Sequence, residues 1–292
     1  MKGNAMKTCD LHTHSTCSDG SLTPTQLAKE AARRGLTAIA LTDHNTAKGL
    51  SEFVFAGASE GLLTVPGCEF STDHEFGGRK KELHIVGLFF PREAWPQIED
   101  HVDIMRLAKI RSNYNLISAL RADGYDVTYE EAQALTEAET FNRSHVARIL
   151  LEKGQIGSTK EAFETILKEG NGYYVPAGRL SAVTTVKFIK AYGGAAVLAH
   201  PFLNATYDEL DSFLGVARDN GLDAIETLYS EFDEEQTAAA KSLAGKYGLL
   251  ESGGSDFHGE AKPHIQLGVG RGNLCVPFEF YEALRAASYL GQ

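Results

Sequence analysis

Short apolar runs recur along the chain, and most of them stop at a polar, ionisable residue. Runs of this length, bounded by polar or turn-forming residues, are typical of buried strands. The pattern predicts seven such strands: Cys9–His14, Thr37–His44, Leu63–Glu69, Leu83–Phe90, Ala195–His200, Leu222–Tyr229 and Leu249–His258. They occupy the two ends of the chain and leave a long gap between them.

Helical patterns lie between several of these runs. Thr25–Arg34 follows Pro24, and Tyr207–Asn220 is a second amphipathic stretch; Gly35 and Gly221 stand where the two helices should stop. Strands that alternate with helices predict an α/β fold with a mainly parallel sheet and helices outside it. In closed barrels of this type the chemistry lies at the carboxyl ends of the strands, where the ionisable residues fall.

The segment between residues 101 and 186 has a different pattern. Helical periodicity covers Val102–Leu120, His145–Glu152 and Lys160–Lys168, and no strand is predicted there. We therefore expect a barrel domain made of residues 1–100 and 187–292, with residues 101–186 as an inserted helical cap subdomain. An insertion between two strands on the active-site face would be expected to act as a lid over the pocket.

Composition limits the classes of function. The chain has 292 residues, of which 43% are hydrophobic and 23% are charged, so a packed core should form. The formal net charge of -11 argues against binding of long duplex nucleic acid or of a membrane through bulk charge. A phosphate ligand would therefore need a local source of positive charge.

Location and redox state follow from two absences in the sequence. No run approaches the roughly 18 apolar residues of a spanning helix, so we expect a cytoplasmic protein without membrane contact. The four cysteines are scattered without a CxxC pair, which favours free thiols and excludes a zinc site built from four cysteines.

A metal site is the strongest chemical signal. His12 and His14 are two positions apart on a predicted strand, so both imidazoles project to one face and can bind one ion. Alone, the pair would more simply be two ordinary histidines. Seven further nitrogen and oxygen donors, however, fall at or near other strand ends: Asp19, His44, Glu69, His84, His200, Asp256 and His258. This donor set suits manganese, zinc or iron.

Nine donors exceed what one ion of this kind uses, so two to three divalent ions are implied. Adjacent divalent ions generate hydroxide from water near neutral pH and neutralise phosphoryl oxygens during displacement. They would also supply the positive charge that an acidic protein needs for a phosphate ester.

These motifs carry a family resemblance. DLHTHSTCSDG, LTDHNT, PGCEFS, LHIVG, AHPF and GGSDFHG resemble the motif series of the PHP (polymerase and histidinol phosphatase) family of metal-dependent phosphoesterases. The resemblance covers about residues 7–90 and 190–270 and implies a distorted (β/α)7 TIM-like barrel with a trinuclear metal site.

The resemblance also implies how the ions are held. His12, His14, Glu69 and Asp256 would hold the first ion, and Glu69 would bridge to a second ion held by His84 and His200. Asp19, His44 and His258 would hold the third. We expect His12, His14, His200 and Asp256 to be required for catalysis, with manganese as the favoured metal.

The insertion resembles that of the subfamily acting on nucleotide and short oligonucleotide phosphates. On this resemblance Arg111, Asn115, Arg143 and His145 would lie near a substrate phosphate that does not react, which an Arg fork binds bidentately. A plain polar helix face is the alternative for the two arginines, and helix capping or packing is the alternative for His145. His264 is a further candidate, at the rim of the pocket.

The predicted function is therefore hydrolysis of phosphate esters of nucleotides or short oligonucleotides by metal-activated hydroxide. A 3',5'-bisphosphonucleotide phosphatase and a 5'-3' exoribonuclease would use the same site. A histidinol-phosphate-type phosphatase and a non-catalytic, metal-binding regulatory module are the alternatives. The predicted partner is a small phosphate ester; the sequence predicts neither the physiological substrate nor the oligomeric state.

Overall fold

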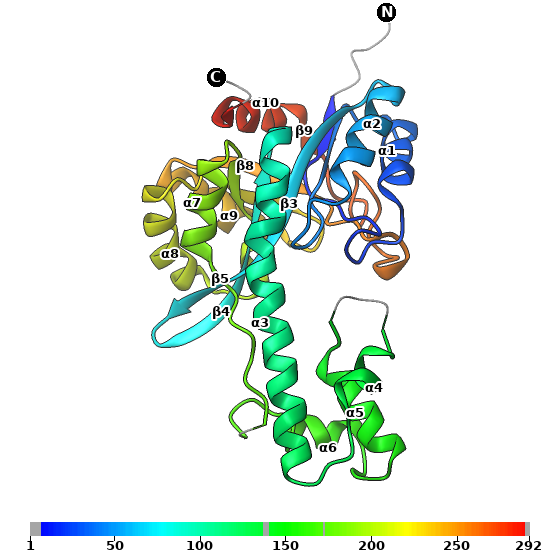
Figure 1. Ribbon diagram of the computed structural model, residues 1–292. Helices are drawn as coiled ribbons and strands as arrows, with labels where there is room; N and C mark the ends of the chain where they lie inside the picture. Colours follow the sequence, from blue (N-terminus) through cyan, green and yellow to red (C-terminus); the bar gives the residue numbers. More distant parts are fainter. Residues whose placement is uncertain (1–6, 137–139, 172, 290–292) are drawn as a thin grey trace, which may run out of the picture. The chain divides into compact units, whose positions relative to one another are not determined.

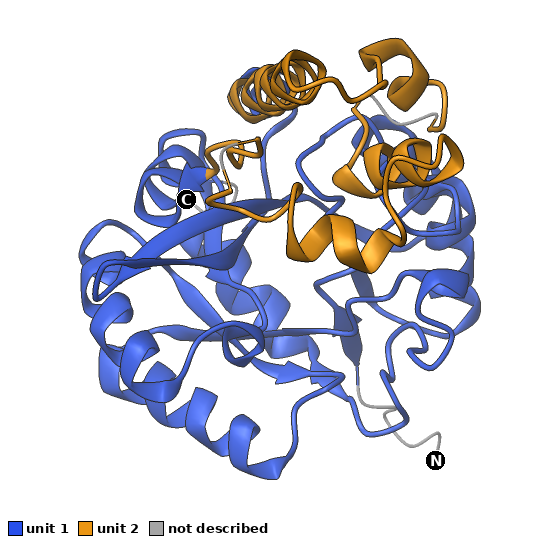
Figure 2. Cartoon of the chain, turned by 90° about the horizontal axis from the view of Figure 1, so that it is seen from below, with its two compact units in different colours: residues 1–100, 180–292 blue, residues 101–179 orange. Residues whose placement is uncertain are grey.

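The computed structural model describes residues 7–136, 140–171 and 173–289 (Figure 1). The chain divides into two compact units, which Figure 2 shows in different colours. Unit 1 contains residues 1–100 and 180–292, and unit 2 contains residues 101–179. The structure places the second boundary at Leu180, where the sequence suggested residue 187, because strand β5 (Leu180–Ser181) pairs with strand β3 of unit 1.

One sheet organises unit 1. Along it the strands follow the order β8-β7-β6-β4-β3-β2-β1-β9, and β5 adds to β3. Their bounds are β1 (Thr8–Asp10), β2 (Ala38–Leu41), β3 (Leu63–Phe76), β4 (Arg79–Leu88), β6 (Ala195–Leu198), β7 (Ala224–Tyr229), β8 (Leu250–Gly254) and β9 (Val276–Pro277). Each of the seven predicted strands is present, but β3 and β4 are longer and the other five are shorter than predicted. β9 was not predicted, nor was β5, which lies in the segment where no strand was expected.

The sheet is mainly parallel but contains two reversed strands, β4 and β9. β1, β2 and β3 run parallel to one another, as do β6, β7 and β8, whereas β9 runs antiparallel to β1. β4 runs antiparallel to both β3 and β6, because Gly77 and Gly78, both at positive φ, turn β3 directly back into β4. The carboxyl ends of the parallel strands therefore lie at one end of the sheet.

The sheet closes almost completely into a barrel. The chain beyond β1 lies beside the chain beyond β8: the amide of Leu11 donates to the carbonyl of Gly253 at 3.1 Å, and the amide of Asp256 donates to the carbonyl of His12 at 2.8 Å. A parallel bridge between Thr13 and Phe257 continues this contact. The predicted α/β, TIM-like barrel is confirmed.

Helices alternate with the strands of unit 1. α1 (Pro24–Arg33) begins with a capping box between Thr23 and Gln26, and Gly35 at positive φ follows its end. The other helices of unit 1 are α2 (Leu50–Glu60), α7 (Ala182–Ala191), α8 (Tyr207–Asp219), α9 (Glu234–Tyr247) and α10 (Phe278–Ala287), with short 3-10 turns η1 (Arg92–Ala94), η2 (Pro201–Leu203) and η3 (Gly259–Ala261).

The inside of the barrel is an apolar core. Alternate residues of a strand face the same side of the sheet, so Ala38 and Ala40 of β2 point inward together. They join Leu11, Val65 and Val197 in one buried cluster. This apolar cluster fills the inside of the barrel, and the polar side chains described below gather at its end.

Unit 2 is helical and has a core of its own. Helix α3 (Trp95–Ala122) starts in unit 1 and continues into unit 2, where α4 (Tyr129–Gln133), α5 (Arg143–Glu152) and α6 (Thr159–Glu164) follow. Leu116 and Leu120 of α3 are buried with Val146 and Leu150 of α5. The helical character predicted for the insertion agrees with these elements.

Two further expectations can be compared with the structure. All four cysteines lie within the described residues and are free thiols, although Cys275 is exposed. Over residues 7–136, 140–171 and 173–289, no helix has both the length and the apolar character needed to cross a membrane.

Candidate metal centre

The nine predicted donors come together in unit 1, at the carboxyl ends of the parallel strands. Their side-chain atoms form three overlapping groups, and within each group the candidate ligand atoms lie within 4.8 Å of one another. His200 is the one predicted donor outside these three groups, but its Nε2 lies 2.9 Å from Oε1 of Glu69.

The first group is built around His12 and His14, which follow β1. Both are fully buried, and Nε2 of each lies close to Oε2 of Glu69, at 3.1 and 3.2 Å respectively. Oδ1 of Asp256 lies 3.2 Å from Nε2 of His14 and 3.6 Å from Nε2 of His12. Two imidazoles and two carboxylates therefore face a common point, as the HxH spacing predicts.

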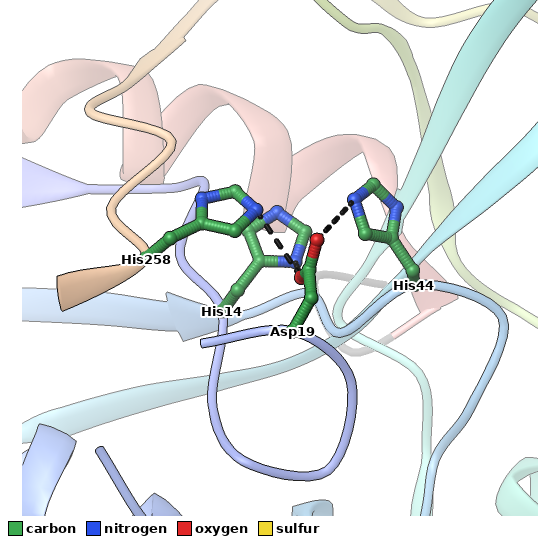
Figure 3. A group of neighbouring side chains, drawn as sticks. All are labelled: His14, Asp19, His44 and His258. Atoms are coloured by element: carbon green, nitrogen blue, oxygen red, sulfur yellow. Dashed lines mark ion pairs between the residues drawn. The ribbon is translucent and has the colours of Figure 1, made fainter. Parts of the chain in front are cut away.

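The second group surrounds Asp19 (Figure 3). Its Oδ1 lies 3.2 Å from Nε2 of His258 and 3.7 Å from Nδ1 of His14, and its Oδ2 lies 3.7 Å from Nε2 of His44. Asp19 is the most exposed of the donors, with a side chain that is 56% accessible. This group therefore forms the open side of the centre.

The third group shares Glu69 with the first. Nδ1 of His84 lies 2.7 Å from Oε1 of Glu69, and Nδ1 of His44 lies 3.0 Å from its Oε2. His84 comes from the reversed strand β4, which brings it beside a donor from β3. Each oxygen of Glu69 thus faces a different set of histidines, which is the arrangement a bridging carboxylate requires.

The residues fit divalent ions. Five buried donor atoms make no hydrogen bond although polar atoms lie near them: Nε2 of His12, both ring nitrogens of His14, Nδ1 of His44 and Oε2 of Glu69. Buried polar atoms without partners are costly, so an unpaired cluster indicates a missing ligand. Donors bound at about 2.0–2.1 Å to a tetrahedral or octahedral ion lie about 2.8–3.4 Å apart, close to the spacings observed here.

The electrostatics of the centre also favour cations. Burial alone would raise the pKa of Glu69, yet the neighbouring charges of His12, His44 and His84 hold this pKa well below its usual range. Burial opposes protonation of His84, but Glu69 and Glu82 raise its pKa to about 9. The buried carboxylates therefore attract positive charge, and divalent ions compete with protons for these nitrogens.

Glu226 orients two of the donors. Its Oε1 accepts a hydrogen bond from Nδ1 of His12 at 2.9 Å, and its Oε2 accepts one from the backbone amide of His200 at 2.6 Å. A carboxylate only accepts, so Nδ1 of His12 carries the proton and Nε2 has its lone pair directed to the centre. Glu226 is buried within β7, so both hydrogen bonds are shielded from solvent.

Two buried aspartates hold the loops that carry the donors, and the sequence analysis missed both. Asp10 accepts from the backbone amide and the hydroxyl of Ser255, next to Asp256. Asp43 accepts from the amide and the hydroxyl of Ser15, next to His14. Each is close to a predicted donor in the sequence and has a carboxylate that could itself be a ligand. Only the three-dimensional contacts distinguish its supporting role from that of a ligand.

Close backbone approaches shape the centre. A Cβ added to Gly254 would lie 2.3 Å from Cβ of His12, and one added to Gly20 would lie 2.5 Å from the carbonyl oxygen of His14. The Gly-rich run before Asp256 is therefore a packing requirement of the site. His200 and Asp256 have φ angles of 26° and 55°, in a region that residues other than glycine seldom occupy.

His264, the predicted rim residue, lies in unit 1 but touches no donor. Its Nε2 lies 3.6 Å from Glu231, and its side chain is 54% accessible. Lys262, which the sequence analysis missed, lies closer to the centre, because its Nζ is 2.7 Å from Oδ2 of Asp256. A lone lysine in a loop carries no sequence signal that separates it from an ordinary surface residue.

The other predicted substrate residues lie in unit 2. Arg111 and Asn115 are on the exposed face of α3. Nδ1 of His145 accepts from the backbone amide of Asn142 at 3.0 Å, which makes it part of a capping box. This is the capping role that the sequence left open for His145.

The side chain of Arg143 makes contacts within unit 2 and does not simply extend from the helix into solvent. Its guanidinium stacks over Tyr174 at 4.1 Å from the ring centroid and donates to the carbonyl of Leu167 at 2.7 Å. Burial lowers the pKa of nearby Lys109, and the charges of Arg143 and Arg179 lower it further. Unit 2 thus gathers three cationic side chains, of which the sequence analysis identified one.

Comparison with known proteins agrees with this centre. The model of the PHP domain matches residues 10–175. A 5'-3' exoribonuclease of Haemophilus influenzae is 32% identical over 86% of this chain and 90% of its own length, and a 3',5'-nucleoside bisphosphate phosphatase of Chromobacterium violaceum is 31% identical over 87% of this chain and 88% of its own length.

A solved structure gives the same result. The protein from Bifidobacterium adolescentis, assigned as a metal-dependent phosphoesterase, superposes with a TM-score of 0.69 and 25% identity over 98% of this chain and 99% of its own. The predicted enzyme class, a hydrolase of phosphoester bonds, is confirmed. The chain therefore belongs to the PHP domain family of metal-dependent phosphoesterases.

Proposed function

We propose that the protein hydrolyses phosphate esters of nucleotides or short oligonucleotides, next to a terminal 5'-phosphate. The observation that carries this proposal is the convergence of nine nitrogen and oxygen donors, several of them buried without hydrogen-bond partners. The relatives named above support the substrate class, because one acts on RNA from its 5' end and the other on nucleoside bisphosphates.

The donors divide into three proposed ion sites. His12, His14, Glu69 and Asp256 would hold one ion. Glu69, with His84 and His200, would hold a second, and Asp19, His44 and His258 a third. Two to three ions are proposed, with manganese favoured over zinc or iron. Bound ions of this kind supply an activated water molecule and neutralise charge on the phosphoryl group.

The chain's own residues prepare the site before substrate binds. Glu226 fixes the tautomer of His12, while Asp10 and Asp43 fix the loops that carry Asp256 and His14. These hydrogen bonds come from the chain's own groups and hold the donors in place, and such preorganisation is the condition for strong electrostatic stabilisation. His12, His14, His200 and Asp256 are the residues we propose as required for turnover.

Substrate recognition is proposed to involve the cations of unit 2. The charges of Arg143 and Arg179 both act unfavourably on that of Lys109, so a bound phosphate group would relieve an unfavourable interaction. The guanidinium of Arg143 is already oriented by Tyr174 and the carbonyl of Leu167, which lowers the entropy cost of binding an anion. Arg111, Asn115, His145 and His264 stay as weaker candidates for contact with substrate.

The direct test is phosphate release from adenosine 3',5'-bisphosphate in the presence of Mn²⁺. We expect release that EDTA abolishes and added Mn²⁺ restores. Adenosine 5'-monophosphate, which lacks the 3'-phosphate, is the matched control, and a short RNA with or without a 5'-phosphate tests the exonuclease reaction. Absence of hydrolysis of the bisphosphate and of both RNAs would contradict the proposal, and hydrolysis of histidinol phosphate alone would favour the alternative.

A further inference from the structure

The two oxygens of the Asp256 carboxylate have different surroundings. Oδ1 faces the histidines of the candidate metal centre, at 3.2 Å from Nε2 of His14 and 3.5 Å from Nδ1 of His258. Oδ2 accepts two hydrogen bonds instead, from Nζ of Lys262 at 2.7 Å and from the hydroxyl of Tyr229 at 2.9 Å. Oδ1 is thus directed to the centre, and the lone pairs of Oδ2 are engaged in hydrogen bonds.

The backbone restrains this orientation. The amide of Asp256 donates to the carbonyl of His12 at 2.8 Å, and the preceding residue, Ser255, is bound through its amide and hydroxyl to Asp10. Asp256 itself has a φ of 55°. Hydrogen bonds at Ser255 and at Asp256 itself hold the backbone at this φ. Backbone movement therefore has little scope to exchange the positions of the two carboxylate oxygens.

Tyr229 and Lys262 approach Oδ2 from different elements. Tyr229 ends β7 and is 3% accessible, so its hydroxyl is fixed within the barrel end. Lys262 follows η3, and its side chain is 35% accessible. A phenol and an ammonium group can only donate to this carboxylate oxygen, so both compete with a metal ion for its lone pairs.

We propose that Lys262 and Tyr229 are positioning residues that make Asp256 a one-oxygen metal ligand. This inference rests on the proposed metal centre. A carboxylate with two free oxygens can bind one ion through both and fill an additional coordination position. Catalytic metal sites need a position that water or substrate can occupy, so donors on Oδ2 would keep that position open.

The test uses the full-length protein loaded with Co²⁺, whose visible absorption weakens as the number of ligands increases. Lys262→Met, Tyr229→Phe and the double variant release Oδ2, and we expect each to lose visible absorptivity relative to wild type. Lys262→Arg keeps a cationic donor and should restore the wild-type spectrum.

The chain offers a matched control. Asp211 also accepts from a lysine and a tyrosine, Lys246 and Tyr247, on the surface of unit 1. Lys246→Met and Tyr247→Phe should therefore leave the Co²⁺ spectrum unchanged. Circular dichroism of every variant verifies that the fold is kept, and Tyr229→Phe removes only one oxygen atom.

The outcomes separate this inference from the proposed function. A wild-type protein that takes up no Co²⁺ would contradict the metal centre itself. Uptake of Co²⁺ with identical spectra for wild type and the double variant would overturn the positioning role alone. A metal-loaded crystal structure gives a second measurement: both oxygens of Asp256 bound to one ion would also overturn it.

Discussion

Nδ1 of His12 donates a hydrogen bond to Oε1 of Glu226 over 2.9 Å, and both side chains are buried. This contact fixes which nitrogen of His12 can bind a metal, because the proton stays on Nδ1. Glu226 also holds the backbone of His200, so it links donors that follow β1 and β6. A residue outside the donor set can therefore control two of the proposed metal ligands.

Replacing Glu226 with glutamine is expected to lower metal affinity and kcat/KM by about 10- to 100-fold, the usual cost of losing a partner that orients a ligand. Chelator competition measures the affinity. Glu251→Gln is the matched control, because Glu251 accepts from Thr227 on the adjoining strand and belongs to none of the donor groups. Equal affinities for the two variants would contradict the role of Glu226.

Removing a proposed ligand should have a larger effect. His14→Ala and Asp256→Asn are expected to abolish turnover, with a loss greater than the roughly 100-fold effect of an orienting partner. His14 belongs to two of the three donor groups, so its loss disturbs both. Circular dichroism should show that the fold persists; wild-type activity in either variant would refute the assignment of the centre.

Asp43 is expected to couple stability to metal binding. It accepts from the amide and hydroxyl of Ser15 and from the hydroxyl of Ser18, in the loop that leads to Asp19. Asp43→Ala leaves these donors unsatisfied, at a cost of about 1–3 kcal/mol in the free energy of unfolding. Denaturant unfolding and metal analysis should both reveal the change, and a variant with normal stability and full metal content would exclude this role.

Arg143→Ala should raise KM for adenosine 3',5'-bisphosphate by about tenfold or more, since a charged hydrogen bond contributes about 1.5–3 kcal/mol. Arg148→Ala is the control in the same helix, because Arg148 is exposed and pairs with Glu152. Steady-state kinetics separates KM from kcat. A KM equal to that of the control would remove Arg143 from substrate binding.

Most of the fold and the donor set could be predicted because both depend on local patterns. Apolar runs that end in ionisable residues identified the strands of the barrel, and spacing placed His12 and His14 on one face. The direction of β4 was not predicted, because an apolar run does not indicate whether its strand is parallel or antiparallel to its neighbour. The reversal depends on the turn at Gly77 and Gly78.

The supporting residues could not be separated from ligands by sequence alone. Asp10 ends β1 and Asp43 closely follows β2, as several predicted ligands do elsewhere, and their partners are distant in the chain. Lys262 lies only six residues after Asp256, yet nothing in that spacing indicates the contact with Oδ2. Such contacts depend on loop conformation, which hydrophobic periodicity does not determine.

The central claim is that imidazoles and carboxylates from distant parts of the chain hold several divalent ions. Elemental analysis of fully active protein, freed of loosely bound metal by gel filtration, tests this claim most directly. The account predicts two to three equivalents of a divalent metal per chain, lost together with activity on treatment with EDTA. At most one equivalent in fully active protein would contradict it.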